Sequence, residues 1–173
     1  MRLHFLNYRF ANEILDSPQC KAIKEEVLDI LTKATVPRLP RPKKRTRHGK
    51  KYTFTTDQTA FNEYFEREFS MRGWEVSPRI TENKTTKIQA DYKKSRVQIE
   101  IQFGNMARWY TDVFKFQVSY SLGSIDVGIL IVPMHVFANT IDENVVYFER
   151  VARELPYAKM SITLPILVIG IEP

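Results

Sequence analysis

The seven residues from Val97 to Phe103 constrain the fold more than any other part of the sequence. Apolar and polar side chains alternate strictly along them, as in a β-strand whose two faces lie in different surroundings. Gln98, Glu100 and Gln102 project from one face, and the four apolar residues project from the other. A strand with one apolar face must bury it against another layer, so the sequence predicts a layered fold.

Helices and strands alternate along the rest of the chain. The predicted strands cover residues 3–10, 87–92, 97–103, 125–132 and 164–171, and the predicted helices cover 18–33, 57–73, 109–122 and 142–155. This order favours an α/β fold with a mixed β-sheet flanked by helices. A length of 173 residues fits one domain, which we expect to span residues 1–173.

Residues 37–51 form a proline-rich and strongly basic segment. It contains three prolines and eight basic residues, namely Arg38, Arg41, Lys43, Lys44, Arg45, Arg47, Lys50 and Lys51. Prolines and charges of one sign oppose packing into a core, so we expect a basic arm or loop. Lys and Arg also exceed Asp and Glu in the whole chain, by 26 to 20, which favours a polyanionic partner.

The cysteine content and the lengths of the apolar runs indicate the cellular compartment of the protein. Cys20 is the only cysteine, which excludes an internal disulfide and a zinc site built from several thiolates. The longest apolar runs, at 128–134 and 166–171, are too short to cross a bilayer, and the first ten residues lack the apolar core of a signal peptide. We therefore expect a cytoplasmic protein without a membrane partner.

Two carboxylates are placed to meet beside the alternating strand. Asp91 precedes Glu100 by nine positions, on the neighbouring strand of a predicted hairpin. Two convergent carboxylates can hold a hard divalent cation such as Mg²⁺, which assists phosphodiester hydrolysis. The same spacing also fits a solvated or ion-paired strand face.

The segment Asp91-Tyr-Lys-Lys-Ser-Arg-Val-Gln-Ile-Glu100-Ile-Gln102-Phe-Gly-Asn105 resembles the catalytic hairpin of the BglII and BstYI type II restriction endonucleases. They form a branch of the PD-(D/E)xK nuclease superfamily in which glutamine replaces the usual lysine, as Gln102 does here. Further similar segments occur in the same order, from 61–63 to 73–74 before the hairpin and at 125–128, 132–134, 164–165 and 169–173 after it. The resemblance implies a PD-(D/E)xK restriction-endonuclease-like core.

The resemblance also implies roles for individual residues. Asp91 would bridge the metal, Glu100 would be a second ligand or orient water, and the backbone carbonyl of Ile101 would complete the protein ligands. Gln102 would position the attacking water. Glu63, on the preceding helix, is either an outer ligand or an exposed glutamate.

The implied activity is hydrolysis of both strands of double-stranded DNA at a short palindromic site, with a GATC centre as the candidate. Mg²⁺ would be the cofactor, Mn²⁺ could replace it, and no nucleotide cofactor is expected. Because a palindrome presents two equivalent strands, we expect a homodimer.

Several residues are candidates for contact with DNA. The resemblance implies that Asn105, in the loop after the catalytic strand, contacts bases, and Arg108 is a further candidate by location. Ser121 and Ser124 are further candidates, for which helix capping and turn formation are the alternative. The candidates for phosphate contact are Lys93, Lys94 and Arg96 in the hairpin, and Arg45, Arg47, Lys50 and Lys51 in the basic segment.

Two other functions are compatible with the sequence. Because Gln102 cannot bring the positive charge of a lysine, the chain could be a sequence-specific DNA-binding protein with an inactive or regulatory nuclease fold. Its basic character alone also suggests an RNA-binding protein, but paired aromatic RNA-binding motifs are lacking.

Overall fold

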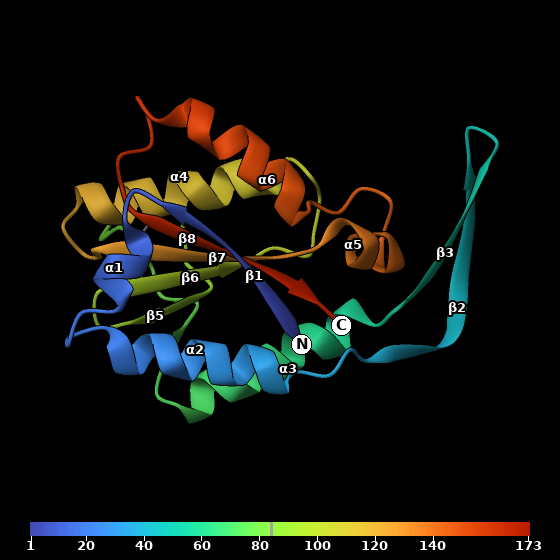
Figure 1. Cartoon of the computed structure of the whole chain (residues 1–173), viewed down its shortest axis with the longest axis horizontal. Coiled ribbons are helices and arrows are strands. Elements are labelled where there is room, and N and C mark those ends of the chain that lie inside the picture. The colour runs from blue at the N-terminus through green and yellow to red at the C-terminus, as the bar shows by residue number, and fades with distance from the viewer. Residues whose placement is uncertain (84) are drawn as a thin grey trace.

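A mixed β-sheet forms the centre of the computed structural model, which describes residues 1–83 and 85–173 (Figure 1). Its strand order among the described residues is β1-β8-β7-β6-β5-β4. The strands are β1 (Arg2–Tyr8), β4 (Glu75–Val76), β5 (Tyr92–Lys94), β6 (Val97–Ile101), β7 (Val127–Pro133) and β8 (Ile166–Glu172). The three central strands β6, β7 and β8 run parallel, whereas β1, β5 and β4 join antiparallel.

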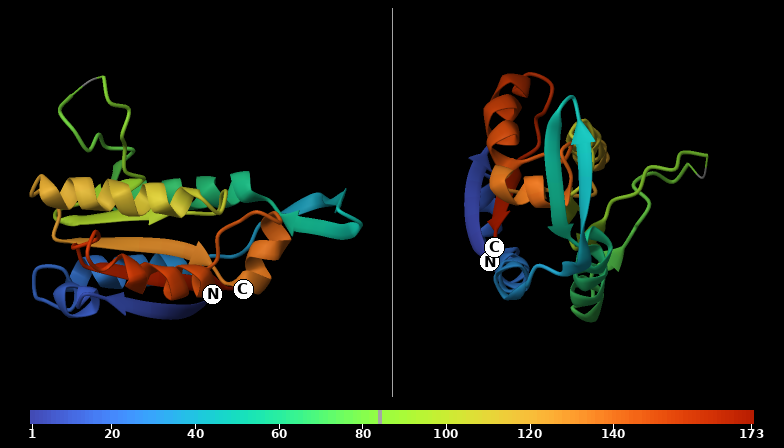
Figure 2. Two further views of the ribbon diagram at one scale, coloured as in Figure 1. Left: turned by 90° about the horizontal axis from the view of Figure 1, so that it is seen from above. Right: turned by 90° about the vertical axis from the view of Figure 1, so that its right-hand side faces the viewer.

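Helices cover both faces of this sheet (Figures 1 and 2). One hydrophobic cluster joins the sheet to α1 (Ala11–Leu15), α2 (Lys21–Lys33), α3 (Gln58–Met71) and α5 (His135–Ile141). A second cluster joins the other face to α4 (Arg108–Ser121), α6 (Phe148–Glu154) and the short 3-10 helix Leu155–Ala158. The predicted α/β sheet flanked by helices is therefore confirmed. Within the described residues, no helix is both long and apolar enough to span a membrane.

The helix α3 shows how the sequence directs this packing. The carboxylate of Asp57 accepts a hydrogen bond from the backbone N–H of Ala60 and so caps the first turn. Phe61, Phe65 and Phe69 recur every four residues and are fully buried. The ring of Phe61 stacks on that of Phe103 at 5.1 Å, which fixes α3 beside the end of β6.

Residues 37–56 form a projecting β-hairpin rather than an irregular loop (Figure 1). Its strands are β2 (Arg38–Arg47) and β3 (Lys50–Thr56). The register shifts between Arg38 and Lys43, so Pro40 and Pro42 fall where the ladder is interrupted. His48 and Gly49 both have positive φ, as a tight hairpin turn requires. The arm is thus regular because its prolines avoid the paired positions.

Other predictions about secondary structure were wrong in detail. The strand expected at 87–92 begins only at Tyr92, and α1 and α5 were not predicted. The helix expected from residue 142 begins at Phe148. Before it, the carbonyl of Asn144 accepts from the N–H of Met106, and the N–H of Val146 donates to the carbonyl of Gly104. This segment therefore pairs with the loop after β6 instead of forming a helix.

Gly128 in β7 allows α4 to lie close to the sheet. A Cβ atom at this position would lie 2.9 Å from ring atoms of Phe116, which is fully buried on α4. We expect Gly128→Ala to destabilise the protein by about 1 to 3 kcal/mol through overpacking. The free energy of unfolding can be measured by urea denaturation.

The double variant Gly128→Ala/Phe116→Leu tests the cause. A smaller side chain at position 116 should relieve the clash, so the double variant should lose less stability than the sum of the two single changes. Strictly additive losses would show that the ring of Phe116 does not limit the space at Gly128.

Candidate active site

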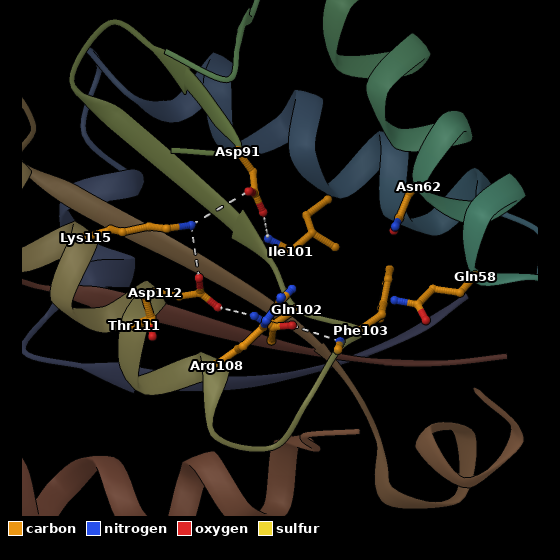
Figure 3. A pocket seen from close by; sticks show the side chains of 11 residues that line it. Gln58, Asn62, Asp91, Ile101, Gln102, Phe103, Arg108, Thr111, Asp112 and Lys115 are labelled. Atoms are coloured by element: carbon orange, nitrogen blue, oxygen red, sulfur yellow. Dashed lines mark hydrogen bonds and ion pairs between the residues drawn. The ribbon is translucent and has the colours of Figure 1, made fainter. Parts of the chain in front are cut away.

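A cavity of about 340 Å³ lies at the carboxyl end of β6, between α3 and α4 (Figure 3). Asp91, Ile101 and Gln102 line it from the sheet. The other walls come from α4, through Arg108, Thr111, Asp112 and Lys115, and from α3, through Gln58 and Asn62. Asp91 and Gln102 of the predicted site therefore share one cavity with side chains from two helices, whereas Glu100 is buried beneath it and does not line it.

The polar face of β6 is buried against α4. Its three polar residues pair with three residues of that helix: Gln98 with Ser119, Glu100 with Lys115 and Gln102 with Asp112, each at 2.6 Å. Glu100 has no exposed surface, and 8% of Gln102 is exposed. The face is therefore not solvated, but the ion-paired form of the alternative agrees with the contact between Glu100 and Lys115.

Asp91 lies immediately before β5, next to Glu100. Because Tyr92 pairs with Ile99 in the sheet register, the preceding residue comes level with Glu100. The Asp91 carboxylate accepts a hydrogen bond of 2.8 Å from the backbone N–H of Ile101. Its other oxygen lies 3.9 Å from Nζ of Lys115, which is also 2.6 Å from Oε2 of Glu100. The two carboxylates are thus close enough to share one cation.

Burial and neighbouring charges shift the pKa values of both acids. Burial raises the pKa of Glu100 well above its ordinary value, and the charge of Asp91 adds to this effect, although Lys115 opposes it. Burial also raises the pKa of Asp91, against the stabilising N–H of Ile101 and the charge of Lys115. Asp91 keeps 39% of its side-chain surface exposed to the cavity. We therefore expect the charged form to be less disfavoured in Asp91 than in Glu100.

Asp112 and Lys115 were not found from the sequence. Both lie on α4, three residues apart, and their charged atoms are 3.2 Å from each other. The available signal was a polar stripe formed by Arg108, Asp112 and Lys115 on a helix whose other faces are aromatic. That spacing indicates one helix face but does not indicate which strand the face covers.

The donor set suits a hard cation. Asp91 and Glu100 contribute carboxylate oxygens, and the ammonium of Lys115 already lies among three carboxylates. Among the described residues, however, no three Asp, Glu, His or Cys side chains form a ready-made metal cluster. A metal would therefore bind through the two carboxylates together with backbone, water or substrate oxygens.

Some predicted contact residues lie near the cavity. Arg108 lines it directly, and Asn105 lies in the loop after β6, where its side chain accepts a hydrogen bond from the N–H of Ala107. Glu63 is exposed and does not line the cavity, whereas its neighbour Asn62 does. The structure thus favours the reading of Glu63 as an exposed helix glutamate.

Other predicted contact residues lie at the opposite end of the hairpin. Lys93 lies in β5 opposite Gln98, two residues from Asp91. Lys94 binds Glu26 at 2.8 Å, and Arg96 binds Asp126 at 2.6 Å. Both charges are therefore engaged within the protein at the turn end of the hairpin, and contact of these residues with DNA stays a prediction.

The predicted contact residues Ser121 and Ser124 lie at the carboxyl end of α4 and in the loop that follows it. Ser124 donates to the carbonyl of Ser119, and the hydroxyl of Ser121 accepts from Gln117 at 3.3 Å. Both interactions are local, within the last turns of the helix and the loop after it. They favour the capping and turn alternative for these serines.

Comparisons with known proteins agree on one family. The model of the restriction endonuclease BglII/BglIII family matches residues 3–171. The crystal structure of restriction endonuclease BglII complexed with a DNA 16-mer has a TM-score of 0.80 and 20% identity, over 98% of this chain and 76% of that chain. The structure of free BglII has a TM-score of 0.71 and 19% identity, over 100% and 80%. Both confirm the predicted fold. No curated protein matches the sequence.

The raised pKa of Glu100 predicts the effect of Glu100→Gln on stability. A carboxyl whose pKa is higher in the folded than in the unfolded protein destabilises the fold once it ionises, so stability falls as the pH rises through the folded-state pKa. The amide mimics the protonated acid at every pH. We expect the melting temperatures of variant and wild type to agree near pH 4.5 and that of the variant to become the higher as the pH rises above this value.

Thermal melts in metal-free buffer measure this difference. Glu25→Gln, at an exposed position of α2, is the matched control and should show no such divergence. A variant that is less stable than the wild type at every pH would contradict the predicted direction.

Proposed function

Since this chain belongs to the restriction endonuclease BglII/BglIII family, we propose that it is a type II restriction endonuclease that cuts both strands of DNA by Mg²⁺-dependent hydrolysis. The observation that carries this proposal is the convergence of Asp91 and Glu100 on one cation position at the edge of a cavity. Phosphodiester hydrolysis needs such a position, because negative charge builds up on the phosphate during attack.

Asp91 and Glu100 would hold the divalent ion, together with the carbonyl oxygen of Ile101. When bound, the ion would acidify a water molecule and offset charge on the phosphate. Mn²⁺, which also accepts oxygen ligands, should replace Mg²⁺. The N–H of Ile101 keeps the carboxylate of Asp91 in place at 2.8 Å.

Gln102 would orient the attacking water. Its side-chain amide donates to Asp112 at 2.6 Å, and its side-chain oxygen accepts from the N–H of Gly104 at 2.8 Å. These two bonds fix the plane of the amide, and the second amide N–H is left to orient a water molecule. No covalent intermediate is required.

The DNA would lie across the cavity and along the basic hairpin. Related BglII is known in complex with a DNA 16-mer. Lys50 and Lys51 are exposed near the tip of the hairpin, whereas Arg45 and Arg47 contact Glu143 at 3.2 and 3.5 Å. We assign phosphate contact first to the two lysines, and base or backbone contact near the site to Asn105 and Arg108.

A palindromic target would be cut by a homodimer, because a two-fold axis presents two copies of the site to the two strands. A GATC centre is the candidate for that target. Sequencing the ends of digested fragments identifies both the target and the cleavage position.

Cleavage assays test the proposed site. Purified protein incubated with phage DNA and Mg²⁺ should yield discrete fragments, and Asp91→Asn should reduce the cleavage rate by at least about 100-fold, because one metal ligand loses its charge. The exposed variant Glu25→Gln should cleave like the wild type. Discrete cutting by Asp91→Asn at the wild-type rate would refute the assigned site, and tight binding without cleavage by the wild type would favour an inactive nuclease fold.

Salt-dependent binding tests the hairpin. We expect Lys50→Ala/Lys51→Ala to weaken binding to duplex DNA and to reduce the slope of log affinity against log salt by about 2, since each phosphate contact contributes about 0.9. Fluorescence anisotropy without divalent metal measures both quantities. Lys21→Ala/Lys159→Ala removes the same charge from exposed positions at the start of α2 and in the loop before β8, outside the hairpin, and should leave the slope nearly unchanged. Equal slopes for the two double variants would exclude the hairpin as a phosphate-binding arm.

A further inference from the structure

Lys115 is the cation at the centre of the candidate active site. Its Nζ atom lies 2.6 Å from Glu100, 3.2 Å from Asp112 and 3.9 Å from Asp91. Only 18% of its side chain is exposed. Lysine is seldom buried without a specific counter-charge, and here three carboxylates from two strands and one helix surround a single ammonium.

The position of this ammonium is the one that a metal ion would need. At a pH at which all three carboxyl groups are ionised, they carry more negative charge than one lysine neutralises, so the cluster then retains affinity for further positive charge. Asp91 and Glu100, the proposed metal ligands, are two of the three groups that contact Lys115. A divalent ion bound between them would therefore repel the ammonium from its present place.

The side chain of Lys115 borders free space into which its ammonium can move. Its side chain reaches from α4 into the cavity beside Arg108 and Thr111 (Figure 3). A lysine stem has four flexible carbons, so the ammonium can turn without movement of the helix. A second cavity between α4 and residues 87–91 also borders Lys115. Both spaces adjoin Asp91, one of the two proposed metal ligands, and the proposed function lays the DNA across the first of them.

We propose that Lys115 occupies the cation position of the metal-free site, yields it to the divalent ion, and then places its ammonium on the substrate phosphate. This inference rests on the proposed nuclease function. It assigns to a helix residue the positive charge that the amide of Gln102 cannot supply in the hairpin. Lys115 would thus be a catalytic residue as well as the competitor of the metal.

Metal binding without DNA tests the first half of this inference. Isothermal titration with Mg²⁺ should show that Lys115→Met binds the ion at least about tenfold more tightly than the wild type. The variant lacks the positive charge that lies within 4 Å of both proposed metal ligands, Asp91 and Glu100, and that would repel the ion. Lys94→Met is the matched control, since that lysine also contacts a glutamate but lies at the far end of the hairpin. It should leave the affinity for Mg²⁺ unchanged.

Unchanged or weaker Mg²⁺ binding by Lys115→Met would overturn the inference, because a lysine with a purely structural role predicts that result. If this variant is unfolded without metal, the melting temperature replaces the titration. Mg²⁺ should then raise it more than it raises that of the wild type, and a smaller rise would again overturn the inference.

Cleavage at saturating Mg²⁺ tests the second half. Lys115→Met should cut DNA at least about 100-fold more slowly than the wild type, whereas Lys115→Arg, which keeps the charge, should retain more activity than Lys115→Met. Cleavage by Lys115→Met at the wild-type rate would overturn the catalytic role. A wild type that does not cut DNA would instead refute the proposed function, and the metal titration would still report on the resident cation.

Discussion

The buried polar contact between β6 and α4 is the interaction on which the site depends. A strand places alternate side chains on one face, and a helix places residues three or four apart on one face, so three residues of each element meet in register. Glu100 could not remain buried without such a partner, because an isolated carboxylate in a protein interior is strongly destabilised. The close approach of α4 to the sheet over Gly128 brings the two faces within hydrogen-bonding distance.

The hairpin half of the site could be predicted from the sequence, but the helix half could not. Strand alternation is a local pattern, so it identified the polar face of Glu100 and its neighbours, and the resemblance added Asp91. The roles of Asp112 and Lys115 depend on which face of the sheet α4 covers, and that is decided by the crossover from β6 to β7. The same limitation applies to Lys94, a predicted DNA contact, since its partner Glu26 lies 68 positions away.

The basic hairpin and the site are joined by one chain of contacts. Arg45 of the hairpin contacts Glu143, and the following residue, Asn144, accepts a backbone hydrogen bond from Met106 in the loop after β6. Gly104 in the same loop donates to the side chain of Gln102. The segment expected to be helical instead contains a turn at 143–144, and its backbone groups pair with the loop that carries Asn105. The arm and this loop therefore contact the same segment.

The contacts of Gln102 with α4 and with the loop after β6 explain why glutamine suits this position better than lysine. Its side chain both donates to Asp112 and accepts from the N–H of Gly104, and a lysine ammonium has no acceptor atom for the second bond. A lysine there would also bring a second ammonium beside Lys115, within the same group of carboxylates. The neutral amide avoids this repulsion and keeps both neighbours hydrogen-bonded. The departure from the usual lysine is therefore consistent with a site whose positive side chains, Lys115 and Arg108, come from α4.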